Sequence, residues 1–146
     1  MDDALFERIL VPLADPDDAA QTARALRPYV DSETTLIITH VTEDDGSEAA
    51  IVRGRNHFAE EIYGTFISVL DRDDVRLEWV TLQGREVAET IIDGTDAVDA
   101  TLIAFCPRGL DRWAQVIAGD PASRLIHDAD VPVITVPDRA DGFIFE

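Results

Sequence analysis

The hydrophobic residues of this chain gather in five short runs, at residues 9–13, 35–41, 75–82, 101–105 and 131–136. Four of these runs are nearly continuous Ile, Leu and Val, which is typical of strands covered on both faces of a parallel sheet. The run at 75–82 alternates in part between apolar and polar residues, which favours a strand at the edge of the sheet. The pattern therefore predicts five strands.

The segments between these runs carry apolar residues at helical spacing. Asp15 and Asp120 each stand before a proline, so each places a side-chain acceptor at the start of a helix that begins at Pro16 or Pro121. We expect four helices, each with one apolar face. The four faces are Ala19, Ala23, Leu26 and Val30; Phe58, Ile62, Phe66 and Leu70; Val87, Ala88, Ile91 and Ile92; and Ala122, Leu125, Ile126 and Ala129.

Strands that alternate with helices indicate a doubly wound α/β sandwich, in which right-handed crossovers place helices on both faces of a five-stranded parallel sheet. The length of 146 residues fits one domain, residues 1–146. We expect a surface loop at residues 42–50, and Trp79 between sheet and helix. The tail, residues 138–146, holds Phe143-Ile144-Phe145 and is too apolar for a solvated extension. It is expected to pack on the domain or on a partner chain.

The charge of the chain is strongly negative. Against 30 acidic residues it has 12 basic ones, all of them Arg, for a net charge of −18. The acids are spread along the whole sequence, and Asp outnumbers Glu two to one. This usage resembles that of proteins from salt-accumulating halophiles, where molar salt screens repulsion within roughly 3 Å. A nucleic-acid partner is excluded, because its phosphates would be repelled.

Other function classes are excluded by what the sequence lacks. Cys106 is the single cysteine, so the chain forms no internal disulfide, and no zinc-ligand spacing is present. No apolar run approaches the roughly 20 residues of a membrane span, and the acidic start Met1-Asp2-Asp3 is unlike a secretory signal. We expect a soluble cytoplasmic protein that contacts neither membrane nor nucleic acid.

Ligands in such sheets sit beyond the carboxyl ends of the strands, where the strand order reverses. The segments there contain no Ser-His-acid set, nucleophile elbow or Walker loop, so we expect no catalytic residue and no enzyme activity. His40 is expected to be packed, whereas His57 and His127 are expected at the surface. A phosphoacceptor receiver domain is excluded, because the chain has no Lys and no acid pair after its first strand.

The fourth strand carries the most informative pattern: Leu102-Ile103-Ala104-Phe105-Cys106-Pro107-Arg108-Gly109, nine residues, then Gly119-Asp120. This resembles the universal stress protein family, whose members have a strand, Gly-x-x-Gly, nine residues, Gly-Ser or Gly-Thr, a helix and a last strand close to "CPVLVV". Ile9-Leu10-Val11-Pro12, the strand at 36–41, Gly84 and the run at 131–136 match other family strands in order. The resemblance covers nearly the whole chain.

The resemblance implies a Rossmann-like fold of the adenine nucleotide alpha hydrolase type, with a nucleotide cleft at the strand ends. ATP-binding members hold the triphosphate, together with Mg²⁺, on backbone N–H groups of the glycine loop and on the Ser or Thr hydroxyl. If this cleft is retained, the matching positions here are Pro12, Leu13, Val41, Gly84, Cys106, Arg108, Gly109, Gly119, Asp120 and Pro121.

Three positions depart from the ATP-binding pattern. Cys106 replaces the first glycine, Asp120 replaces the hydroxyl residue, and Ala14 stands where binders carry an aspartate; Gly109 and Gly119 are retained. The carboxylate of Asp120, as a helix cap, would occupy the anion site, and a unit-charge repulsion at about 4 Å costs about 4 kcal/mol before salt screening. We therefore expect a non-catalytic regulatory module that binds neither ATP nor another cofactor. The alternative is an ATP-binding sensor that uses Mg²⁺ and has at most weak ATPase activity.

The resemblance also implies a homodimer that forms through the last strand. The residues expected at this interface are Val131, Val133 and Thr135, and the tail 138–146 would extend it. An apolar edge strand that stays unpaired is an aggregation hazard, so a partner strand is expected there. A further, unidentified protein partner is expected for the regulatory role.

Overall fold

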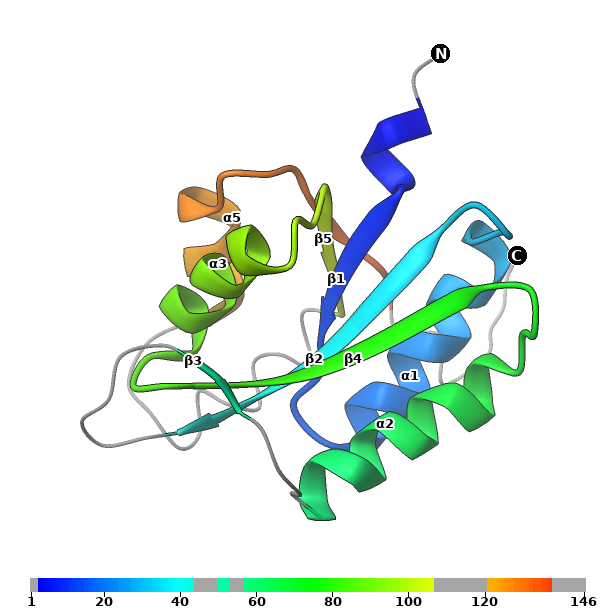
Figure 1. The fold of residues 1–146 in the computed structure, drawn as a ribbon, viewed down its shortest axis with the longest axis horizontal. Helices are drawn as coiled ribbons and strands as arrows, with labels where there is room; N and C mark the ends of the chain where they lie inside the picture. The colour runs from blue at the N-terminus through cyan, green and yellow to red at the C-terminus, as the bar shows by residue number, and fades with distance from the viewer. Residues whose placement is uncertain (1–2, 44–49, 53–56, 107–120, 138–146) are drawn as a thin grey trace.

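The computed structural model describes residues 3–43, 50–52, 57–106 and 121–137. In chain order its elements are η1 (Asp3–Phe6), β1 (Arg8–Pro12), α1 (Pro16–Leu26), η2 (Arg27–Tyr29), β2 (Thr35–Glu43), β3 (Ala50–Val52), α2 (His57–Leu70), β4 (Arg76–Gly84), α3 (Val87–Ala97), β5 (Leu102–Phe105), α5 (Pro121–Asp128) and β6 (Val133–Thr135). Figure 1 shows these elements coloured along the chain.

The sheet has the order β3-β4-β2-β1-β5-β6. Its five strands β4, β2, β1, β5 and β6 are parallel, which confirms the predicted five-stranded parallel sheet. The short β3 was not predicted: it pairs antiparallel with β4 and begins at Ala50, within the segment expected as a surface loop. At the other end of that segment, β2 continues to Glu43.

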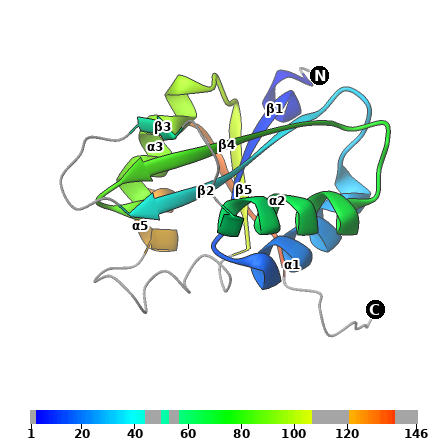
Figure 2. The same cartoon turned by 60° about the horizontal axis from the view of Figure 1, so that its bottom comes forward.

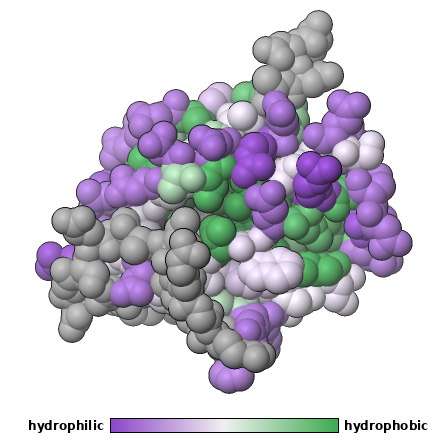
Figure 3. Space-filling view, viewed as in Figure 1, coloured by the Kyte–Doolittle hydropathy of each residue, from purple (hydrophilic) through white to green (hydrophobic). Residues whose placement is uncertain are grey.

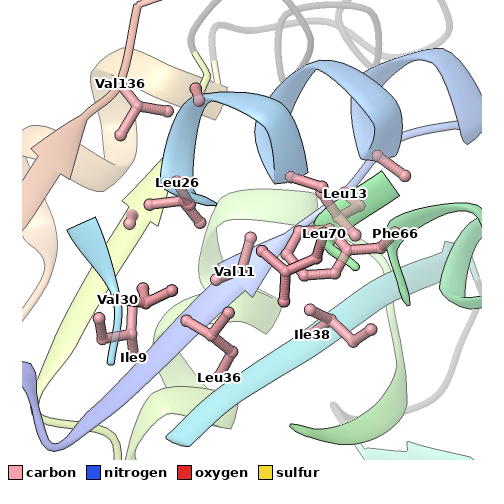
Figure 4. Close-up of a cluster of buried hydrophobic side chains, with 14 of the residues drawn as sticks. Ile9, Val11, Leu13, Leu26, Val30, Leu36, Ile38, Phe66, Leu70 and Val136 are labelled. Atoms are coloured by element: carbon pink, nitrogen blue, oxygen red, sulfur yellow. The ribbon is translucent and has the colours of Figure 1, made fainter. Parts of the chain in front are cut away.

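Helices cover both faces of this sheet. Helices α1 and α2 pack side by side on one face, and α3 and α5 pack on the other, as Figures 1 and 2 show from two directions. Each face has its own apolar cluster: Val11, Ile38 and Phe66 belong to the first, shown in Figure 4, and Leu10 and Leu125 belong to the second. Neighbouring residues of β1 thus point to opposite faces, as strand geometry requires.

The helical faces agree with the sequence pattern at most positions. Among the face residues whose burial is described, Phe58, in the first turn of α2, is 47% exposed and Ile126 on α5 is 54% exposed. Trp79 also differs from its expected position between sheet and helix. It stacks on Tyr63 of α2 with ring centroids 6.2 Å apart, but 56% of it is exposed because β4 lies near the edge of the sheet.

The surface reflects the acidic composition. On the face seen in Figure 3, hydrophilic residues surround a central hydrophobic area. Ion pairs join some of the charges, including Arg72 with Asp74 at 2.8 Å and Arg8 with Glu78 at 3.2 Å. None of the helices in the described ranges has the length and apolar character needed to cross a membrane.

Candidate functional site

The strand order reverses at β1, because the chain moves from β1 to β2 on one side and later returns to β5 on the other. Crevices at such a reversal are where doubly wound sheets bind ligands. The structure brings five of the predicted site residues to the carboxyl-end half of the sheet and starts α5 at a sixth, Pro121. The five are Pro12, Leu13, Val41, Gly84 and Cys106. Arg108, Gly109, Gly119 and Asp120 lie outside the described residues.

Both backbone groups of Leu13, directly after β1, are hydrogen-bonded within the chain. The Leu13 N–H donates to the Thr39 carbonyl at 2.8 Å, and His40 Nδ1–H donates to the Leu13 carbonyl at 2.8 Å. His40 is buried, as predicted, and its ring meets Phe58 edge-on with centroids 5.3 Å apart. Burial lowers the pKa of His40, while the hydrogen bond to Leu13 and the carboxylate of Asp15 offset part of that shift.

The next backbone N–H is held by a buried carboxylate. Asp18, only 1% exposed, accepts from the Ala14 N–H at 2.8 Å through one oxygen and from the Thr22 hydroxyl at 3.1 Å through the other. Asp15 accepts from the Asp18 N–H at 2.7 Å, which confirms Asp15 as the helix cap. The positive end of the α1 dipole further stabilises these carboxylates. An anionic group of the chain itself therefore occupies the start of α1.

Asp18 is the residue that the sequence analysis missed. In a chain with so many acids, Asp17-Asp18 looks like another solvated pair, and Asp17 is indeed exposed. The available signal was the spacing Asp15-x-x-Asp18, which is a variant of the capping box, in which an acid three residues after the cap reaches back to the backbone before the helix. Thr22, one helical turn after Asp18, supplies the second partner.

Gly84 has a packing reason that is independent of any ligand. A Cβ atom built on Gly84 would stand 2.0 Å from the Thr90 hydroxyl oxygen of α3, so the end of β4 needs a residue without a side chain. Thr90 donates in turn to the Glu86 carbonyl at 2.6 Å. The match of Gly84 to the family pattern is thus explained by the close approach of β4 and α3.

Arg124, on α5, is already paired. Its guanidinium contacts Glu86 at 2.7 Å and Asp128 at 3.2 Å, and these two carboxylates raise the pKa of Arg124. Cys106, directly after β5, is 1% exposed and packs in the apolar cluster under α1. Within the described ranges, no three His, Cys, Asp or Glu side chains gather closely enough to hold a metal ion.

Comparison with known proteins settles the family. The model of the universal stress protein family matches residues 5–137, nearly the whole chain. The chain belongs to the universal stress protein family. Among curated proteins, none matches it significantly.

Solved structures of universal stress proteins share the fold. The universal stress protein from Archaeoglobus fulgidus in complex with dAMP is 22% identical, with a TM-score of 0.64 over 90% of this chain and 98% of that one. A universal stress protein family member from Arabidopsis thaliana with AMP bound is 11% identical, with a TM-score of 0.58 over 95% and 96%. A universal stress protein in complex with cAMP is 14% identical, with a TM-score of 0.58 over 91% and 98%. At these identities the likeness shows the fold alone.

The buried carboxylate of this universal stress protein yields a stability prediction. In D18A, the Ala14 N–H and the Thr22 hydroxyl lose a buried acceptor, so the free energy of unfolding should fall by about 1–3 kcal/mol. Urea unfolding followed by circular dichroism measures the change. The matched control is D17A, which removes the neighbouring exposed carboxylate and should cost less than about 1 kcal/mol. Equal losses in the two variants would contradict a structural role for Asp18.

Proposed function

We propose that this universal stress protein is a non-catalytic regulatory module that acts through protein contacts and does not bind ATP. The observation that carries the proposal is the closure of the chain after β1 by its own groups. The Asp18 carboxylate accepts a hydrogen bond from the Ala14 N–H, and the His40 imidazole donates one to the Leu13 carbonyl. Two backbone groups at the point of strand reversal, the Ala14 N–H and the Leu13 carbonyl, are therefore already bonded.

Charge at the same place supports the proposal. Asp15 and Asp18 put two carboxylates at the start of α1, and a phosphate brought within about 4 Å of one such charge near the surface meets about 4 kcal/mol of repulsion. Arg124 on α5 is engaged by Glu86 and Asp128. A phosphate near the start of α1 would therefore meet two carboxylates of the chain.

The sequence departures point the same way. Ala14 is an apolar, 8% exposed residue where ATP-binding members carry an aspartate near the nucleoside. Cys106 brings a side chain to the position of the first glycine, and Asp120 brings a charge to the position of the hydroxyl. The alternative, an ATP-binding sensor, is supported by the retained Gly109 and Gly119 and by the nucleotides in the related structures.

Calorimetric titration with ATP and Mg²⁺ in molar KCl separates these two functions. We expect no saturable heat for the wild type. C106G/D120S should gain affinity of at least about tenfold, since removal of only about 1.4 kcal/mol of repulsion changes the affinity about tenfold. The control D130S removes an exposed aspartate from the segment between α5 and β6 and should gain nothing. Saturable micromolar binding by the wild type would contradict the proposal; no gain in C106G/D120S would place the obstruction at Ala14 or Asp18.

We infer further that the protein forms a homodimer through the open edge of β6. Val136 N–H donates to the Phe105 carbonyl and the Pro132 carbonyl accepts from Ile103, so these residues bond toward β5. Because bonding alternates along a strand, the backbone groups of Val131, Val133 and Thr135 point to the open side. Unpaired strand groups of this kind are a template for a second copy.

The variant T135P tests this interface. Proline removes the Thr135 N–H on the open side, where an edge strand tolerates it, and leaves the bonds to β5 in place. Light scattering should give twice the 16.1 kDa chain mass for the wild type and one chain mass for T135P. T135V keeps the N–H and should remain a dimer. A monomeric wild type, or a dimeric T135P, would contradict the interface.

We propose that the surface is adapted to molar salt, on the ground of its net charge of −18 and the absence of Lys. KCl should then raise the unfolding temperature steeply as the screening length falls from about 10 Å at 0.1 M to about 3 Å at 1 M. Sucrose at equal osmolality controls for solute exclusion and should stabilise less. Equal effects of sucrose and KCl would contradict electrostatic adaptation.

A further inference from the structure

An apolar pocket of about 280 Å³ lies beside the open edge of the sheet, on the face that carries α1. Its floor is formed by β1 and β5, and its walls come from the end of α1, η2 and the chain around β6. The lining residues are Phe6, Ile9, Leu26, Tyr29, Val30, Leu102, Ala104, Ile134, Thr135, Val136 and Pro137. None of them is charged, so the pocket is built for an apolar occupant.

The pocket lies toward β5 and β6, because α2 packs over β2 and β4 of the same face and leaves this part of the face less covered. Figure 4 shows Ile9, Leu26, Val30 and Val136 at one end of the apolar cluster, away from Phe66. The floor is fully buried, but two aromatic residues at the rim are left open to solvent. Phe6 is 42% exposed and Tyr29 is 63% exposed. This concentration of exposed aromatic surface beside a hollow marks a site that something apolar covers.

The chain itself supplies a suitable segment. Pro137 forms part of the pocket wall, and residues 138–146 follow it directly. This tail begins with a polar stretch at 138–142 and then carries Phe143-Ile144-Phe145, three consecutive apolar residues. The charged residues of the tail would remain in solvent, because the uncharged lining offers them no partner. The Phe-Ile-Phe triplet is the part that matches the pocket chemically.

Length and linkage favour the tail of the same chain over that of a second copy. Five residues separate Pro137 from Phe143, and a stretch of that length spans at most about 18 Å. Because Pro137 itself lines the pocket, this length is enough for the triplet to turn back into it. Gly142 gives the backbone freedom just before the triplet. A segment tethered so closely has an effective concentration of about 1 mM at its own pocket.

We propose that Phe143-Ile144-Phe145 docks into the pocket of its own chain and covers Phe6 and Tyr29. The docked tail would lie beside Thr135 and Pro137, next to the open edge of β6, and would border the dimer interface without forming it. The pocket is thus an internal docking site for the tail. This assignment is independent of whether the strand ends bind ATP.

An engineered disulfide tests the docking. In a C106A background, I144C is combined with Y29C at the pocket rim, and the protein is mildly oxidised. Docking predicts an intramolecular disulfide, seen as a fast-migrating, reducible monomer band whose rate of formation does not depend on protein concentration. The matched control is I144C with I126C, because position 126 is similarly exposed but lies on α5, on the opposite face of the sheet. The Y29C pair should close at least about tenfold faster than this control.

Each other result overturns the proposal. Covalent dimers of the Y29C/I144C protein would mean that the tail of a second copy fills the pocket. Equal closure rates in both pairs would mean that the tail does not choose the pocket, and no cross-link at all would mean that it stays away. These three outcomes are distinguished on one non-reducing gel at two protein concentrations.

A second measurement reads the pocket directly. The variant F143S/I144S/F145S leaves the described core untouched and should uncover the pocket, so the fluorescence of the apolar dye ANS should rise severalfold. The control D138S/R139S/D141S changes the same tail without altering its apolar triplet and should bind as little dye as the wild type. Equal dye binding by the triplet variant and the wild type would overturn the docking.

Discussion

The need of a parallel sheet to be covered on both faces determines most of this structure. Successive residues of β1 point to opposite faces, so Val11 and Leu10 must each find a helical partner. Crossovers to both faces meet this need, and they also reverse the order in which strands are added to the sheet beside β1. Because the strands are parallel, their carboxyl ends meet at one edge of the sheet, and the reversal lies at that edge. The candidate site is a consequence of this coverage, because the same crossovers bring its residues to one edge of the sheet.

At that edge, the chain satisfies its own polar groups. Asp18 and His40 are both buried, and each bonds to the backbone just after β1. A buried carboxylate is costly unless it is bonded, so its partners Ala14 and Thr22 are part of the same arrangement. In the proposed function, these bonded groups of the chain would stand in the way of a nucleotide, while the topology of the family is kept.

The sequence predicted the features that repeat along the chain and missed those that depend on contact in space. Continuous apolar runs were sufficient for the five parallel strands, and Asp15-Pro16 was sufficient for the start of α1. Three residues of β3 are too few for a periodic signal. Phe58 follows the helical spacing, but it lies in the first turn of α2, where it contacts the His40 ring and stays partly exposed. Asp18 is buried against Ala14 and Thr22, which approach it only in the folded chain, so the composition alone does not distinguish it from the exposed acids.

The two borders of the sheet differ in how readily they would accept another strand. At one border, the short β3 pairs with only the last part of β4, residues 81–83. The uncovered part of β4 carries the exposed residues Arg76 and Glu78, whose charges hinder the approach of another strand. The border at β6 carries no such guard among its described residues, Val133 to Thr135. A protein that can pair at both edges of its sheet can assemble without limit, whereas a protein that can pair at one edge stops at a dimer. In the proposed homodimer, the charged residues Arg76 and Glu78 on β4 would therefore limit the assembly to two copies.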